Sequence, residues 1–417
     1  MAPGGTEVKD LLHDADERLL RVLRDPLLWD PPELVSREEV ETIFAAVEKE
    51  DADADALCRR LLTGSALQWA DRVRDTPGTR TVGMVRQLLK RMPAMVERRP
   101  ADALQLTSLA IAIAEAINPQ SYWPDHVLLA RGQALRDHAY VLSFLGRYAD
   151  SLKVAEQAER TFAQVPDADV DVARLALVKA SALRMQNRGE EAIALARQAA
   201  QTFLDYEDRS RYVNARITEA AMLYYSGAVE RALEVWTSVK DDPGLDALGE
   251  LRITHNIAAC LSDLGRHAEA VDSFARCVSE FALLDLPTER TRSRWYLGNA
   301  LVGTARPRQG IAALRLAWDE FNDLGLPVDA ALAALDLADA LVANQQPGQV
   351  PMICREVIAQ LTEAGLAMQA IPALSLLREA AAMGRVSRGL IRDTHAKVKR
   401  AGRGGDARLA LANDRRV

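Results

Sequence analysis

The most informative segment of the chain runs from His255 to Val271 and reads HNIAACLSDLGRHAEAV. It predicts two amphipathic helices separated by a tight turn at residues 264–266. Gly265 favours that turn because glycine adopts, at little cost, the left-handed conformation that ends a helix. The small residues Ala258 and Ala270 lie on either side of the turn, so the two helices can approach closely. The segment therefore predicts a helical hairpin.

The same hairpin recurs along most of the chain. Turns of this kind appear at residues 145–148, 187–189, 226–227, 305–307 and 345–347. The packing position that follows each turn recurs at spacings of 41, 40, 38, 40 and 40 residues, at Ser151, Ala192, Ala232, Ala270, Gly310 and Val350. A second marker, residues 281–287, returns 40 residues later at 321–327. A fixed period of this length predicts an all-α stack of hairpins, an α-solenoid.

The composition agrees with a large helical protein. Of the 417 residues, 49% are apolar and 27% are charged, so the chain can bury a core and is not disordered. The four cysteines form no CxxC pair, which argues against a zinc site or a disulfide framework and favours a reducing, cytoplasmic location. The N-terminus has no signal-peptide pattern, and no apolar stretch is long enough to span a membrane.

Charge is distributed unevenly. The net charge is −7, yet residues 385–417 carry ten Lys or Arg against three Asp or Glu. Residues 30–55 hold ten acidic and two basic residues. An acidic body argues against general nucleic-acid binding, with weak phosphate contact through the basic tail as the exception. The alternative is a tail that is simply solvated.

The repeated residues resemble the tetratricopeptide repeat (TPR) family. The shared features are a small residue in the first helix, glycine in the turn, an aromatic after it at Tyr148, and alanine late in the second helix, at Ala158, Ala199 and Ala317. That family repeats every ~34 residues, so the longer period implies longer helices or inter-repeat turns. The resemblance implies a right-handed superhelical α-solenoid of TPR-like hairpins. The layout also resembles bacterial regulatory TPR arrays that carry a variable N-terminal module.

Four segments are expected from these patterns. Residues 1–80 form a helical N-terminal module or a cap of the solenoid, 81–131 an atypical first helix pair or pairs, 132–380 the repeat array, and 381–417 a basic helix and tail. The sequence SREE, at residues 36–39, is a capping box that predicts a helix to about Glu50. Residues 84–92 and 101–117 predict a further hairpin. Whether the final basic helix caps the array or docks on another copy stays open, as does the oligomeric state.

Patterns that carry catalysis are missing from the sequence. Phosphate-binding glycine loops and HExxH motifs do not occur, and the six histidines are scattered. Cys277 and Cys354 fall at positions expected to be buried, and Trp236 falls at a helix-packing position. We therefore expect a protein that is not an enzyme and that has no cofactor and no metal.

The resemblance also implies where a partner binds, because the first helices of a TPR array line a concave groove. Arg, Tyr, Trp and Asn recur at these positions, and Trp, Tyr and Arg dominate binding hot spots. The expected groove residues are Arg136, Tyr140, Asn214, Tyr224, Arg252, His255, Asn256, Arg292, Trp295, Tyr296, Asn299, Asp336 and Asp339.

Two interpretations of this set stay open. In the first, Arg252 and Arg292 together hold an anionic group, and His255 makes the grip sensitive to pH near neutrality. In the second, Trp295 and Tyr296 pack between helices while the arginines pair with acidic residues of the chain itself, Asp336 and Asp339.

The leading functional hypothesis is a cytoplasmic scaffold or adaptor that binds a peptide or helix of another protein in the groove. The alternative is a peptide-sensing regulator that controls a transcription factor or effector protein by changing conformation. An enzyme or enzyme subunit is the third hypothesis.

Overall fold

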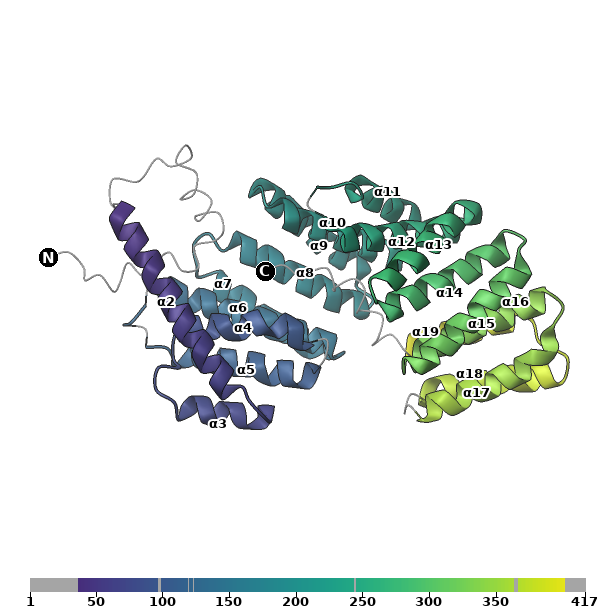
Figure 1. Cartoon of the computed structure of the whole chain (residues 1–417), viewed down its shortest axis with the longest axis horizontal. Helices are drawn as coiled ribbons and strands as arrows, with labels where there is room; N and C mark the ends of the chain where they lie inside the picture. Colours follow the sequence, from purple (N-terminus) through teal and green to yellow (C-terminus); the bar gives the residue numbers. More distant parts are fainter. Residues whose placement is uncertain are drawn as a thin grey trace. The chain divides into compact units, whose positions relative to one another are not determined.

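The computed structural model describes residues 37–401 apart from 97–98, 119, 123, 244 and 364–366. This part of the chain contains eighteen α-helices, two short 3₁₀ helices and no β-strand (Figure 1). The all-α prediction is therefore confirmed. Residues 1–36 of the expected N-terminal module, which include the first residue of the predicted capping box, lie outside the described residues. Residues 402–417 of the basic tail lie outside them too.

The contacts divide the chain into two compact units, and the boundary between them in the sequence falls between Ala215 and Arg216. We call residues 37–215 the N-terminal unit and residues 216–401 the C-terminal unit. The helices of the N-terminal unit are α2 (Arg37–Leu61), α3 (Trp69–Arg74), α4 (Val82–Val96), α5 (Pro100–Ala116), α6 (Pro124–Phe144), α7 (Tyr148–Phe162), α8 (Asp169–Met185) and α9 (Gly189–Asp205), with the 3₁₀ helix η1 (Ala66–Gln68) before α3. The division falls within α10 (Arg209–Tyr225).

Two predictions for the N-terminal unit can be compared with these bounds. The hairpin expected from residues 84–92 and 101–117 is present as α4 and α5, which pack against each other. The helix expected to end near Glu50 continues to Leu61, so that boundary was wrong. No glycine or proline interrupts residues 51–61, and the first left-handed residue after them is Gly64, with φ of 66°.

The C-terminal unit continues the hairpins. Its helices are α11 (Val229–Val239), α12 (Ala247–Asp263), α13 (His267–Leu283), α14 (Pro287–Gly303), α15 (Pro307–Asp323), α16 (Pro327–Ala343), α17 (Val350–Glu363), α18 (Ala367–Ala382) and α19 (Arg388–Ala401), with the 3₁₀ helix η2 (Pro347–Gln349) before α17. Helices that follow each other in the chain pack against each other, as in α12–α13 and α14–α15.

Every repeat turn contains one residue in the left-handed conformation. These residues are Gly146, Asn187, Gly227, Gly265, Ala305 and Gln345, with φ between 59° and 88°. Each sits at the same place between the two helices of its hairpin, and the backbone N–H of the next residue donates back to the preceding helix. Three of the six are not glycine, so the turn geometry is set by the hairpin and not by glycine alone.

Small residues let the two helices of each hairpin touch. A Cβ added to Gly310 would lie 2.7 Å from the carbonyl oxygen of Gly298, which leaves no space for any side chain. At the equivalent place in the N-terminal unit, Ser151 Oγ donates to the carbonyl oxygen of Ala139 at 2.7 Å. The predicted packing position is therefore a close backbone approach in both units.

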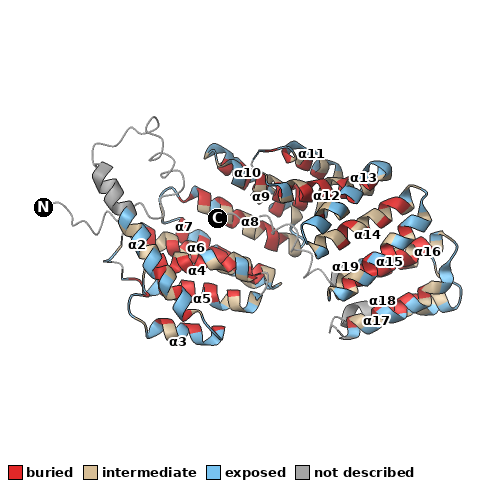
Figure 2. Ribbon diagram, in the orientation of Figure 1, coloured by how far each residue is buried: buried red, intermediate tan, exposed pale blue. Residues whose placement is uncertain are grey.

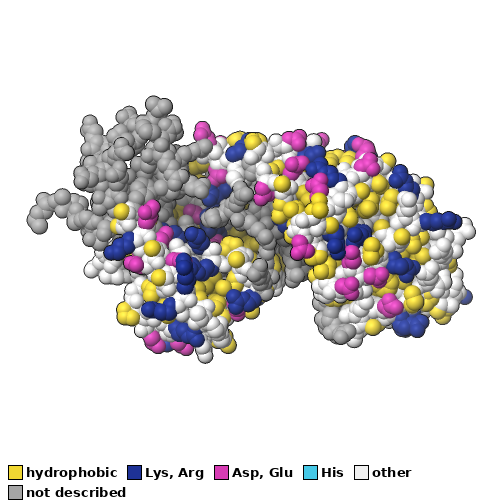
Figure 3. Space-filling view, in the orientation of Figure 1, with side chains coloured by type: hydrophobic (Ala, Val, Ile, Leu, Met, Phe, Trp, Pro, Cys, Tyr) yellow, Lys and Arg dark blue, Asp and Glu magenta, His cyan; other side chains and the backbone are white. Residues whose placement is uncertain are grey.

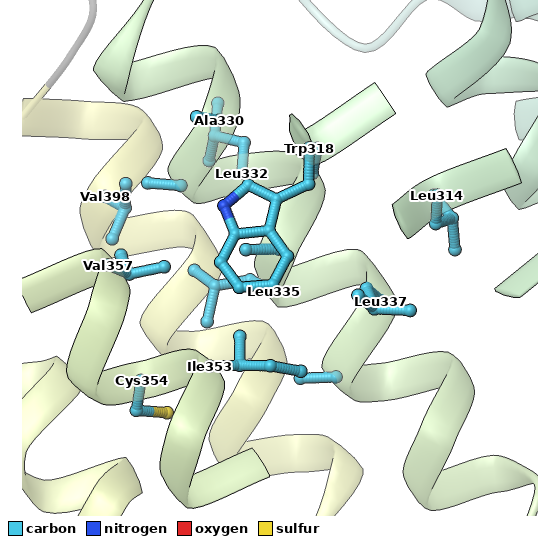
Figure 4. Packing of buried hydrophobic residues seen from close by; sticks show 14 of the residues in the cluster. Leu314, Trp318, Ala330, Leu332, Leu335, Leu337, Ile353, Cys354, Val357 and Val398 are labelled. Carbon is cyan, nitrogen blue, oxygen red and sulfur yellow. The ribbon is translucent and has the colours of Figure 1, made fainter. Parts of the chain in front are cut away.

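Buried residues line the facing sides of the helices (Figure 2). At the C-terminal end, the indole of Trp318 lies among Leu335, Ile353 and Val357, with Val398 of α19 on the same cluster (Figure 4). Cys277, Cys354 and Trp236 are buried, as their positions predicted. Cys260 is buried too.

The last hairpin reverses the usual order of its helices. In earlier repeats the first helices lie next to one another, with α12 beside α14 and α14 beside α16. The helix beside α16 on its other side is α19, whereas α18 packs beside α17. The basic helix therefore completes the layer of first helices. We call this layer, formed in each unit by the first helices of the hairpins, the inner layer.

Candidate functional site

The C-terminal unit has a pocket on its inner layer, between α10, α12, α14 and α16. We call it the C-terminal pocket; its volume is about 90 Å³. Seven of the thirteen predicted groove residues line it: Tyr224, Arg252, His255, Asn256, Arg292, Trp295 and Tyr296. These seven residues come from three helices, α10, α12 and α14, and although they are spread over more than seventy positions of the sequence they meet at one site.

The other predicted residues lie elsewhere. Asn299, Asp336 and Asp339 are on α14 and α16 but are not among the pocket residues. Arg136 and Tyr140 line a separate pocket of the N-terminal unit. Asn214, on α10, lines neither pocket.

Each arginine of the C-terminal pocket is paired with a carboxylate of the next inner helix. Arg252 Nη2 lies 3.1 Å from Glu289 Oε1, and Arg292 Nη2 lies 3.4 Å from Asp329 Oδ1. All four side chains are at least four-fifths buried. The two arginines therefore do not face an open anion site, and their partners are not Asp336 and Asp339.

The acidic partners Glu289 and Asp329 were missed by the sequence reasoning. A signal was present, because both lie in the first turn of an inner helix, 40 residues apart, and each follows its arginine by 37 residues. Carboxylates in a first helical turn are favoured by the helix dipole, so their position alone does not distinguish a pairing residue from an ordinary one.

His255 is buried in the wall of the C-terminal pocket. Its Nδ1 lies 2.9 Å from Ser293 Oγ, on the next inner helix. Burial, and to a smaller extent the charge of Arg292, lowers the pKa of His255 to about 4. The imidazole is thus neutral at physiological pH, and the prediction of a grip that titrates near neutrality was wrong.

Aromatic rings form the rest of the wall. Tyr224 donates its hydroxyl to Asp263 Oδ2 at 2.7 Å, and its ring lies 5.9 Å from that of Trp236. Trp295 donates Nε1–H to Asp336 Oδ2 at 2.7 Å and packs its ring edge-on against Phe321. Trp295 therefore belongs both to the pocket lining and to the core, as the interpretation that it packs between helices expects, and its role in binding a partner stays a prediction.

Tyr225 is a further pocket residue that the sequence reasoning did not select. It is 38% exposed and lies edge-on to Tyr224, with 5.5 Å between the ring centroids. The prediction used fixed positions of the first helix, and Tyr225 falls outside those positions although it lines the same pocket.

The acidic residues of α16 hold the basic helix α19. Arg388 donates to both carboxylate oxygens of Asp339, at 2.8 and 2.5 Å. His395 Nε2 lies 3.4 Å from Asp336 Oδ1, the carboxylate that also accepts from Trp295 and Asn299. These residues are thus engaged in closing the end of the inner layer.

All four cysteines are buried. Burial raises the pKa of Cys260 and of Cys277 to about 12. Within residues 37–401, apart from the gaps given above, no cluster of three or more His, Cys, Asp or Glu residues could hold a metal ion. In the same part of the chain, no helix has the length and apolar character needed to cross a membrane.

Known structures share this architecture, although the sequence itself has no match among protein-family models or curated proteins. The apo form of the quorum sensor NprR from B. thuringiensis aligns with a TM-score of 0.55 and 13% identity, over 93% of this chain and 99% of that one. A signal-transduction ATPase (STAND protein) from Pyrococcus horikoshii with a tetratricopeptide repeat sensor aligns with a TM-score of 0.53 and 10% identity, over 88% of this chain and 66% of that one. The chain therefore has the TPR-like solenoid fold that its repeats predicted.

Proposed function

We propose that the chain is a non-catalytic protein-binding scaffold or adaptor, which holds a peptide segment or helix of a partner at the C-terminal pocket. The observation that carries this proposal is the convergence of Tyr224, Tyr225, Trp295 and Tyr296 with buried polar groups on four inner helices. Aromatic residues and arginine in a desolvated site are the usual anchors of protein recognition. The buried thiols, with their raised pKa values, support a non-catalytic protein, and free cysteines fit the reducing cytoplasm.

The size of the cavity suggests how a partner is held. A volume of about 90 Å³ corresponds to roughly three water molecules in the liquid. Such a cavity receives one side chain, while the rest of the bound segment lies along the inner helices. The C-terminal pocket therefore binds one anchoring side chain of the partner and does not enclose a whole peptide.

The charges favour an uncharged anchor. Arg252 with Glu289 and Arg292 with Asp329 form two buried pairs that cancel in net charge. A charged anchor would have to separate one of these pairs and leave a buried carboxylate or guanidinium unpaired, which is costly. The aromatic wall instead favours an apolar or aromatic side chain.

The test is a selection from a displayed random-peptide library on the purified full chain, followed by titration of the labelled consensus peptide by fluorescence anisotropy. Tyr225→Ala, which removes an exposed wall of the pocket, should weaken binding at least about tenfold, as expected for a hot-spot residue. Trp295 is less suitable for this test, because its truncation would also open the core.

The matched control is Leu283→Ala, which removes an 85% exposed apolar side chain that does not line the pocket. Equal losses in both variants, or selection of no peptide at all, would contradict binding at the C-terminal pocket.

A peptide-sensing regulator is the second candidate. It is supported by the polar contacts between successive inner helices around the cavity, which a bound side chain would disturb. The two similar structures are described as a quorum sensor and as a protein with a repeat sensor. Small-angle scattering with and without the selected peptide separates the candidates: a changed profile favours the regulator, and an unchanged profile favours the adaptor.

A further inference from the structure

The N-terminal unit has a pocket of its own, between α2, α4, α6 and α8. We call it the N-terminal pocket. Its volume is about 420 Å³, several times that of the C-terminal pocket and within the range of roughly 300–1,000 Å³ typical of small-molecule sites. We propose that it is a second binding site, for a small ligand that carries a carboxylate or phosphate group.

The charge of the lining points to an anion. Four cationic residues, Arg86, Lys90, Arg136 and Arg174, line the N-terminal pocket against two acidic ones. Asp171, beside the pocket, pairs with Arg136 and Arg174, so the surplus is one positive charge, that of Lys90. The chain as a whole carries a net charge of −7, so a surplus of positive charge in one cavity is a local feature. Lys and Arg side chains are prominent on the face of this unit that is visible in Figure 3.

Two of the arginines are held in fixed orientations. Arg136 is 4% exposed, and its Nε donates to Asp137 Oδ1 at 2.8 Å while the guanidinium also pairs with Asp171. Arg86 Nε lies 3.0 Å from Asp51 Oδ1. These pairs make the two guanidinium groups fixed parts of the wall, and the charge that a ligand would meet in excess is that of Lys90.

Lys90 is the cation that a ligand would neutralise. It is exposed, and it forms no ion pair with any residue that the structure describes, although its charge acts on Asp51. The alternative interpretation is that Lys90 is an ordinary solvated surface lysine and that the cavity is filled with water. The two interpretations differ in whether anions bind with saturation.

Apart from Gln87 and Gln133, the remaining lining is apolar or aromatic. Leu89, Met92, Pro93 and Val178 provide the surface, and Tyr140 adds a ring with a polar end. A mostly apolar wall with a few oriented polar groups is the usual composition of a small-molecule site. The favoured ligand therefore has an organic body as well as its acidic group.

The experiment is isothermal titration calorimetry of the full chain with two probes, citrate and inorganic pyrophosphate, at constant ionic strength. We expect saturable binding of at least one probe. Lys90→Gln should weaken it about tenfold, because a hydrogen bond between charged groups is lost. Val178→Phe should weaken binding by narrowing the cavity, with circular dichroism confirming that the variant is folded.

Lys153→Gln is the matched control, since Lys153 is an exposed lysine of α7 that does not line the N-terminal pocket. Tighter binding of citrate would assign a carboxylate ligand, and tighter binding of pyrophosphate a phosphate ligand. Two results would overturn the proposal: no saturable heat with either probe, or equal weakening by Lys90→Gln and Lys153→Gln, which would indicate general attraction by charge.

Discussion

The two pockets use the same helical frame but differ in their balance of charge. In the C-terminal pocket, two arginines are matched by two carboxylates of neighbouring inner helices, and about 90 Å³ is left open. In the N-terminal pocket, four cations face two acids around about 420 Å³, and Asp171 pairs with two of the cations. Ion pairs connect successive inner helices in both pockets, but in the second pocket the positive charge of Lys90 is left over. The hairpins fix the direction of the side chains on the inner helices. The residue types then decide whether these side chains stabilise the fold or bind a ligand.

The largest expected effect tests the structural role of the C-terminal arginines. Arg292→Ala leaves the carboxylate of Asp329 buried without its partner, so the free energy of unfolding should fall by about 3 kcal/mol. Lys90→Gln, in the other pocket, should leave stability nearly unchanged because Lys90 is exposed. Urea denaturation of the two variants measures the difference.

The double variant Arg292→Leu with Asp329→Leu serves as the control, because replacing both members of a buried pair by apolar residues is often neutral. It should recover much of the lost stability. If Arg292→Ala were as stable as the wild type, the stabilising role assigned to the arginines of the C-terminal pocket would be wrong.

The next effect sharpens the comparison through pH. His255 is kept neutral by burial in the folded chain, with a pKa of about 4, but takes up a proton near pH 6.5 when unfolded. Protons then favour the unfolded state, so this group stabilises the fold above pH 6.5 and its contribution is lost as the pH falls toward 4.

Between pH 7 and pH 5 the wild type should therefore lose about 2 kcal/mol through His255 alone, a loss that His255→Gln should not show. Denaturation at the two pH values gives both numbers. The two proteins would have parallel pH profiles if His255 were in fact accessible to water.

The smallest effect concerns a feature that both units share. Arg188 with Glu191 and Arg266 with Glu269 form the same ion pair at the start of a second helix, one pair in each unit. All four side chains are well exposed, so Arg188→Ala and Arg266→Ala should each shift the melting temperature very little and by the same amount. A clear difference between them would show that the units differ in their hairpins as well as in their inner faces.

The repeat register could be predicted from the sequence because it depends on local residues. Glycine favours a left-handed turn, and close helix contacts need small side chains. The structural roles of residues such as Gly265 and Gly310 can therefore be predicted from their residue types. The period then places whole helices. It also brought seven groove residues to one pocket, since equivalent positions of successive repeats lie side by side.

The partners of those residues could not be predicted in the same way. Glu289 and Asp329 carry no local mark that separates a pairing residue from a capping one. The burial of His255 depends on contacts with Phe274 of α13 and with Ser293 and Tyr296 of α14. The reversed final hairpin follows from contacts between α19 and α16, which lie far apart in sequence. Such features depend on tertiary packing, which a repeat pattern does not contain.

The reversed order of α18 and α19 has a consequence for how this array could change its length. A solenoid exposes at its end a surface that fits a further repeat, so it can be extended by duplication or joined end to end with another molecule. Here α19 covers that surface with Ile391 and Val398 and turns Arg392 and Asp393 outward. The helix therefore caps the end of the array, and any added repeat would first have to displace it.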